Sequence, residues 1–123
     1  MVISADPAFV ANLHEVAANC GWNFRDAPNV GDALPMLLTE SIPLVVYDGQ
    51  ESDEWQPAFD KLRQLDSDRC LLLASPAPNP YLWQEVIRFG GFDLLSRTAS
   101  RDEVTRKLMF AWFSTENTRK QEP

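Results

Sequence analysis

The chain has 123 residues, a net charge of −7 and 45% hydrophobic residues. This is enough for one domain with a buried core, and the acidic balance argues against a broad nucleic-acid-binding surface. The start lacks the basic flank and long apolar segment of a signal peptide, and no apolar run approaches the roughly 20 residues that span a bilayer. We therefore expect a cytoplasmic protein that binds neither nucleic acid nor membrane. Cys20 and Cys70 lack metal-ligand spacing, and we expect both to be free thiols.

The first third of the chain alternates strand and helix signals. A short apolar strand over residues 2–3 precedes a helix that Asp6 caps and that stops at Gly21. Apolar and polar residues alternate over residues 22–25, which predicts a second strand at an edge of the sheet. In the short helix that follows, Pro35 must lie in the first turn or kink the helix.

Residues 44–47 form an unbroken apolar run rich in β-branched side chains, which is typical of a strand buried on both faces. Asp48 ends this run and Gly49 breaks it. In open α/β sheets, binding sites lie at the carboxyl ends of the strands, so Asp48 is a candidate site residue. The alternative is that Asp48 only caps a turn.

The second half continues the alternation. Its predicted elements are a helix over 58–65 with Pro57 in its first turn, a strand over 70–74, a helix over 81–89, a strand over 92–95, and a helix from a capping box at Ser100 to about Ser114. Five strands alternating with five helices predict a parallel sheet covered on both faces. We expect one domain over residues 1–114 and a polar C-terminal tail over residues 115–123.

Four stretches, taken in order, resemble the receiver domain of bacterial response regulators. They are Asp6-Pro7-Ala8-Phe9 at the first helix start, residues 31–48 leading to Asp48, the glycine turn with the strand after it over residues 89–95, and the start of the last helix over residues 100–104. The resemblance covers about residues 1–114. It implies a flavodoxin-like (βα)5 fold with strand order 2-1-3-4-5 and a site at the carboxyl ends of strands one, three and four.

The resemblance also implies roles for single residues. Asp48 matches the phosphoacceptor, whereas the family's pair of Mg²⁺-binding acids falls on Ser4 and Ala5, and Asp6 follows them. Only Asp6 and Asp48 are then left as metal ligands in this acidic pocket. We expect that no cofactor is required and that Mg²⁺ binding is weak or absent.

Three further family positions lie in the second half of the chain. The hydroxyl position that contacts the phosphoryl group falls on Ala74 or Ser75, and the spacing favours Ser75. The basic position that binds phosphate falls on Arg97, and the aromatic switch position falls on Leu94. Arg97 either pairs directly with Asp48 or is a solvated surface charge.

The sequence is therefore interpreted as an atypical receiver domain, a non-enzymatic protein-interaction module of two-component or phosphorelay signalling. The alternative is a working receiver that a histidine kinase phosphorylates on Asp48, controlling an output domain or partner outside this chain. In that case Asp6, or Asp53 and Glu54 in the loop after the central strand, would restore Mg²⁺ binding.

The last helix carries apolar residues on more than one face. One stripe suffices to dock a helix on a sheet, and it consists of Val104, Leu108 and Ala111. Phe110 and Phe113, with Trp83 and Ile87 of the helix over 81–89, are then left for an interface. We expect a homodimer, or a contact with a kinase or output domain, through the surface of the fourth helix, fifth strand and fifth helix. The alternative is that these aromatic residues pack inward.

Overall fold

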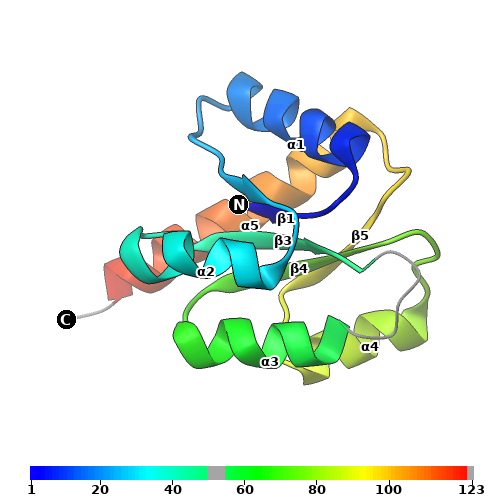
Figure 1. Cartoon of the computed structure of the whole chain (residues 1–123). Helices are drawn as coiled ribbons and strands as arrows, with labels where there is room; N and C mark the ends of the chain where they lie inside the picture. Colours follow the sequence, from blue (N-terminus) through cyan, green and yellow to red (C-terminus); the bar gives the residue numbers. More distant parts are fainter. Residues whose placement is uncertain (50–54, 122–123) are drawn as a thin grey trace.

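The computed structural model describes residues 1–49 and 55–121, with side chains up to residue 116. Its centre is a parallel five-stranded sheet with the order β2-β1-β3-β4-β5 (Figure 1). The strands are β1 (Val2–Ile3), β2 (Asp26–Ala27), β3 (Leu44–Asp48), β4 (Cys70–Ser75) and β5 (Asp93–Ser96). The predicted flavodoxin-like topology is confirmed.

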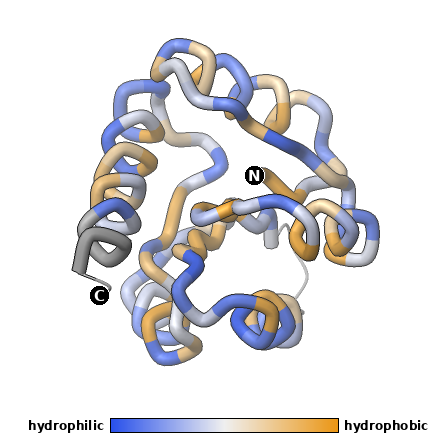
Figure 2. The backbone as a smooth tube through the Cα atoms, turned by 90° about the vertical axis from the view of Figure 1, so that its left-hand side faces the viewer, coloured by the Kyte–Doolittle hydropathy of each residue, from blue (hydrophilic) through white to orange (hydrophobic). Residues whose placement is uncertain are grey.

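Helices cover both faces of the sheet. They are α1 (Pro7–Asn19), α2 (Val30–Thr39), α3 (Trp55–Leu65), α4 (Pro80–Arg88) and α5 (Arg101–Gln121). Buried residues of α1 and α5 pack on one face, and those of α2, α3 and α4 pack on the other. Hydrophobic and hydrophilic segments alternate along the helices (Figure 2), as expected for helices that are buried on one side only.

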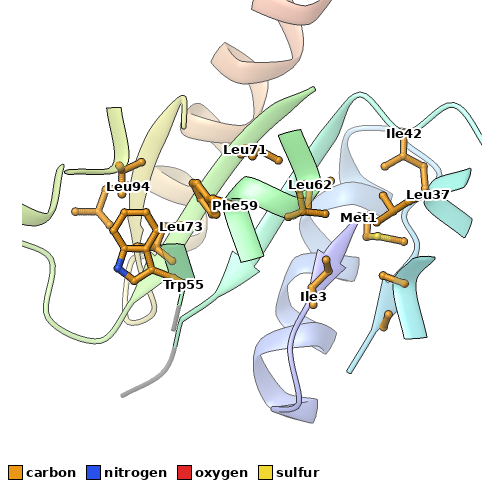
Figure 3. Packing of buried hydrophobic residues seen from close by; sticks show 14 residues of the cluster. Met1, Ile3, Leu37, Ile42, Trp55, Phe59, Leu62, Leu71, Leu73 and Leu94 are labelled. Carbon is orange, nitrogen blue, oxygen red and sulfur yellow. The ribbon is translucent and has the colours of Figure 1, made fainter. Parts of the chain in front are cut away.

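The central strands are buried on both faces, as the apolar run over residues 44–47 predicts. Val45 and Val46 of β3 are both inaccessible to solvent, and they belong to the cores on opposite faces of the sheet. In the core beneath α2 and α3, the side chains of Phe59 and Leu62 lie against Leu71 of β4 (Figure 3). This packing fixes β3, and therefore Asp48 at its end, in the middle of the sheet.

The second strand differs from the prediction. Residues 22–25 are not a strand, and β2 begins at Asp26, four residues after the predicted start. Trp22 packs against Trp112 of α5, and Phe24 packs against the ring of His14, which is also paired with Asp26 at 2.8 Å. These aromatic side chains contact the neighbouring helices, so the alternating pattern reflects helix packing and not sheet pairing.

One helix holds its proline beyond the first turn, and another ends later than predicted. The side chain of Asn29 accepts a hydrogen bond from the Asp32 N–H and caps α2, so this helix begins at Val30 and Pro35 lies beyond its first turn. Helix α5 does not end near Ser114 but continues to Gln121. Thr115 is still buried there, which keeps the helix packed on the domain. Pro57 does lie in the first turn of α3, as predicted.

Both cysteines are free thiols, as expected. Burial, with a smaller contribution from Asp93, raises the pKa of the Cys70 thiol to about 12. Among the helices in the described part of the chain, none is both long enough and apolar enough to cross a membrane.

Candidate functional site

Asp48 lies at the carboxyl end of β3, and its side chain is inaccessible to solvent. The hydroxyl of Ser4, just after β1, donates a hydrogen bond of 2.6 Å to Asp48 Oδ2. The same hydroxyl accepts a hydrogen bond of 3.0 Å from the backbone N–H of Asp6. Ser4 therefore links the first loop to the carboxylate of the central strand.

Arg97 supplies the positive charge of the site. Its Nε lies 3.0 Å from Asp48 Oδ1, and a second nitrogen of the same guanidinium contacts Asp6 Oδ2. The buried Nε is not aligned as a hydrogen bond to any oxygen, so its contact with Asp48 is an ion pair. The guanidinium also lies over the ring of Phe9, 5.3 Å from its centroid. The predicted direct pairing with Asp48 is confirmed, and the solvated alternative is wrong.

The register of the last two strands positions Arg97. Ser75 pairs with Ser96 at the ends of β4 and β5, and the Arg97 N–H donates to the Ser75 carbonyl at 3.0 Å. Ala74 pairs with Asp48 in the β3–β4 register, and Ser75 lies one residue beyond it. The Ser75 hydroxyl accepts a hydrogen bond from the Ala77 N–H at 3.2 Å.

Asp6 has a second role as the N-cap of α1. Its Oδ1 accepts a hydrogen bond of 3.0 Å from the Ala8 N–H. Desolvation would raise the pKa of this carboxyl, but it is outweighed by the hydrogen bonds from the Ala8 backbone and from Arg97, so the pKa of Asp6 is lowered. Ala5, the other position of the expected acid pair, is exposed beside a cavity of about 180 Å³ that also reaches Asp48.

The donor set suits a guanidinium better than a divalent cation. Each carboxylate near the site already contacts Arg97, and each accepts a further hydrogen bond, from Ser4 or from the Ala8 backbone. Within residues 1–49 and 55–121, no three His, Cys, Asp or Glu side chains gather as metal ligands would. Mg²⁺ needs carboxylate oxygens free to face it in an octahedral shell, and this arrangement does not offer them. Asp53 and Glu54 lie outside the described residues.

Two features of this site were not expected from the sequence. The resemblance marks Ser4 only as a missing acid, yet its hydroxyl donates a hydrogen bond to Asp48. It marks Asp6 as a metal ligand, yet this carboxylate shares the guanidinium of Arg97 with Asp48. Leu94, at the aromatic switch position, is a buried core residue without a polar group.

A second candidate region is the exposed apolar surface on α4 and α5. Its members are exposed to 47% (Trp83), 41% (Ile87), 66% (Phe110) and 57% (Phe113), and we call them the α4/α5 surface. The docking stripe of α5 is buried as predicted: Val104, Leu108 and Ala111. Inward packing, the alternative for the four aromatic and apolar residues, is therefore wrong.

No family model matches this sequence, and no curated protein matches it. The fold, in contrast, has many likenesses among solved structures. A response regulator from Thermotoga maritima has 20% identity and a TM-score of 0.84, with 90% of this chain and 93% of that chain covered.

Two others extend the range of similar structures. An orphan response regulator of H. pylori has 11% identity and a TM-score of 0.78, covering 89% of this chain and 92% of that chain. A response regulator from Burkholderia pseudomallei was solved with a phosphorylated aspartic acid, calcium ion and citrate. It has 18% identity and a TM-score of 0.75, and the match covers 99% of this chain and 73% of that chain. The chain thus has the fold of a response regulator receiver domain.

Proposed function

We propose that this chain is an atypical receiver domain of two-component or phosphorelay signalling that acts by binding other proteins. The observation that carries the proposal is the engagement of Asp48. The resemblance matches this carboxylate to the family's phosphoacceptor, and Ser4 and Arg97 already contact it.

The chemistry of phosphoryl transfer explains why this engagement matters. Such transfer depends on positioning and on charge neutralisation, mostly by metal ions. Here the cationic group is a guanidinium fixed between Asp48 and Asp6. To attack a phosphoryl donor, Asp48 would have to give up an ion pair and a charge-assisted hydrogen bond in a buried site, which is costly. We expect no cofactor requirement, weak Mg²⁺ binding and weak or no phosphorylation.

We propose that the protein binds its partners through the α4/α5 surface. Exposed apolar patches usually mark an interaction site. The exposed ring of Phe110 packs against Phe92, in the loop before β5, at 5.6 Å between centroids. We propose that this surface binds a second copy of the chain, a histidine kinase or an output domain, independently of phosphorylation.

Beryllofluoride, an analogue of a bound phosphoryl group, tests the state of Asp48. Amide shifts near Asp48 would be followed while Mg²⁺ and beryllofluoride are added, with Asp48→Asn as the control. We expect affinities at least tenfold below those of a variant carrying Ser4→Asp with Ala5→Asp, which is about 1.4 kcal/mol. Saturable binding by the wild type at millimolar Mg²⁺, abolished by Asp48→Asn, would instead establish a working receiver.

Sedimentation tests the α4/α5 surface. We expect the wild type to self-associate with rising concentration and the double variant Phe110→Glu with Phe113→Glu to remain monomeric and folded. Leu38→Glu is the matched control, because Leu38 is 68% exposed on α2, away from this surface. A wild type that stays monomeric at high concentration would rule out the homodimer and leave a different protein as the partner.

A further inference from the structure

A cavity of about 560 Å³ lies at the amino ends of the strands, the opposite edge of the sheet from Asp48. Four segments line it, namely Met1, residues 22–25 after α1, residues 40–44 before β3, and Trp112 of α5. A cavity of this size, with mixed aromatic and polar walls, is in the range of small-molecule sites.

Aromatic rings form one wall of the cavity. The rings of Trp22 and Trp112 lie 5.6 Å apart between centroids with an interplanar angle of 35°, and both side chains are only partly buried. Ile42 and Leu44, at the start of β3, add apolar surface. Tryptophan faces stack well on other planar rings, so the apolar part of the cavity favours a planar aromatic ligand.

The rim of the cavity carries no net charge. Arg25 and Glu40 both line it, and they pair with each other at 2.9 Å. The remaining polar side chains are Asn23 and Ser41, which are uncharged and exposed.

Met1 also lines the cavity, but its amino group is buried and donates to the Leu44 carbonyl at 2.8 Å. Burial, with a smaller contribution from Arg69, lowers the pKa of this amino group to about 5, so it adds no charge at neutral pH. The cavity therefore offers a charged ligand no opposite charge, whereas a neutral polar edge could reach the amide of Asn23.

The unexpected path of residues 22–25 is an independent observation that favours this site. This segment alternates like a strand, yet it is not one: its contact with β1 is a hydrogen bond of 2.9 Å from the Val2 N–H to the Arg25 carbonyl, and β2 begins at Asp26. Its two aromatic residues line the cavity. The segment therefore supplies two of the three aromatic side chains in the cavity wall.

We infer that this cavity binds a neutral, planar aromatic molecule of about bicyclic size, which packs on the Trp22–Trp112 pair with its polar edge toward Asn23. The inference does not depend on the function proposed for Asp48, because the two sites share no residue.

The test uses N-phenyl-1-naphthylamine, a neutral probe that carries a planar bicyclic naphthalene ring, and the assigned indole N–H signals of the wild-type protein. We expect the signals of Trp22 and Trp112 to shift saturably, while those of Trp55 and Trp83 do not. The anionic analogue 8-anilinonaphthalene-1-sulfonate should bind at least tenfold more weakly. Equal or tighter binding of the anion would refute the neutral ligand class.

A variant that fills the mouth of the cavity provides a second test of where the probe binds. Asn23→Phe should weaken probe binding at least tenfold, and Gln64→Phe, an equivalent change at an exposed position of α3, should not. The wild-type titration decides the question even if Asn23→Phe is unstable. The absence of a saturable shift would show that the probe does not bind. A shift of Trp83 without Trp22 and Trp112 would show that it binds the α4/α5 surface. Either result would overturn the inference.

Discussion

The two edges of the sheet differ in how their side chains are used. At the carboxyl edge, Ser4, Asp6, Asp48 and Arg97 contact one another beside a cavity of only about 180 Å³. At the amino edge, partly exposed tryptophans border a cavity of about 560 Å³. The carboxyl edge is where open α/β sheets place their sites, yet here its charged groups satisfy one another.

This difference shows that a residue can lie at the usual position of a binding site without being free to bind a ligand. A carboxylate at the end of a central strand is reactive only if its oxygens face a donor or a metal. Asp48 instead takes part in a network that ties the loops after β1 and β5 to the end of β3. We therefore interpret the carboxyl edge as a structural cross-link and the amino edge as the open side of the molecule.

Among the substitutions at the carboxyl edge, Arg97→Ala should lower the free energy of unfolding the most. It leaves Asp48 buried without its counter-ion, and breaking a buried pair costs about 3 kcal/mol of unfolding free energy. Urea denaturation measures the loss, and adding Asp48→Ala should recover part of it. Arg101→Ala is the control, because Arg101 and Glu15 form a pair in which both side chains are more than half exposed, worth at most about 1 kcal/mol. Equal losses for both variants would show that Asp48 does not depend on Arg97.

Ser4→Ala should have the next largest effect. The substitution removes a hydrogen bond to a charged, buried group, for which about 1.5–3 kcal/mol is typical. Urea denaturation again gives the value, and Ser100→Ala, which removes only the α5 cap to Glu103, should cost about 1 kcal/mol. If Ser4→Ala is neutral, the link between the first loop and Asp48 contributes nothing to stability.

Acid should weaken the carboxyl edge through Asp6. The folded state lowers the pKa of this carboxyl below its ordinary value of 3.8. Its contribution to stability is therefore present above the ordinary pKa and is lost as the pH falls through the lower, folded value. We expect the urea midpoint to decline below about pH 4, and Asp6→Asn to show a smaller decline. An unchanged acid profile in Asp6→Asn would mean that other carboxyls govern the decline.

The smallest expected effect concerns thiol chemistry at the amino edge. With a pKa of about 12, the buried thiol of Cys70 is protonated at pH 8, and only thiolates react readily. A disulfide reagent should label native protein at one cysteine, the partly exposed Cys20, and reach Cys70 only in denaturant. Labelling of Cys70 in native Cys20→Ser would show that this edge opens frequently.

Much of the fold could be predicted because its signals are local. The apolar run over residues 44–47 has no other stable place than a buried strand, and Asp48 follows directly from it. The strand inference and the position of Asp48 need only the apolar pattern and strand polarity. Arg97 could be expected near Asp48 only through the resemblance to receiver domains, which matches it to the family's basic position.

The remaining features depend on contacts between distant residues. Residues 22–25 have strand periodicity, but their partner Trp112 lies 90 positions away and decides where the aromatic rings pack. Similarly, Ser4 contacts Asp48 across 44 positions and Arg97 contacts Asp6 across 91. Periodicity reports which side of an element is apolar, and it does not report which distant group that side will meet.

The length of α5 has a mechanical consequence. A helix of 21 residues, at about 1.5 Å per residue, is a rod of about 30 Å. Arg101 at its first turn contacts Glu15 on α1, and the rod continues past Trp112 at the far edge of the sheet. A tilt of only about 5° at one end would displace the other by about 3 Å, taking its exposed phenylalanines along. Trp112 and the exposed Phe110 and Phe113 lie on the same helix, so any movement of α5 would shift the cavity wall and part of the α4/α5 surface together.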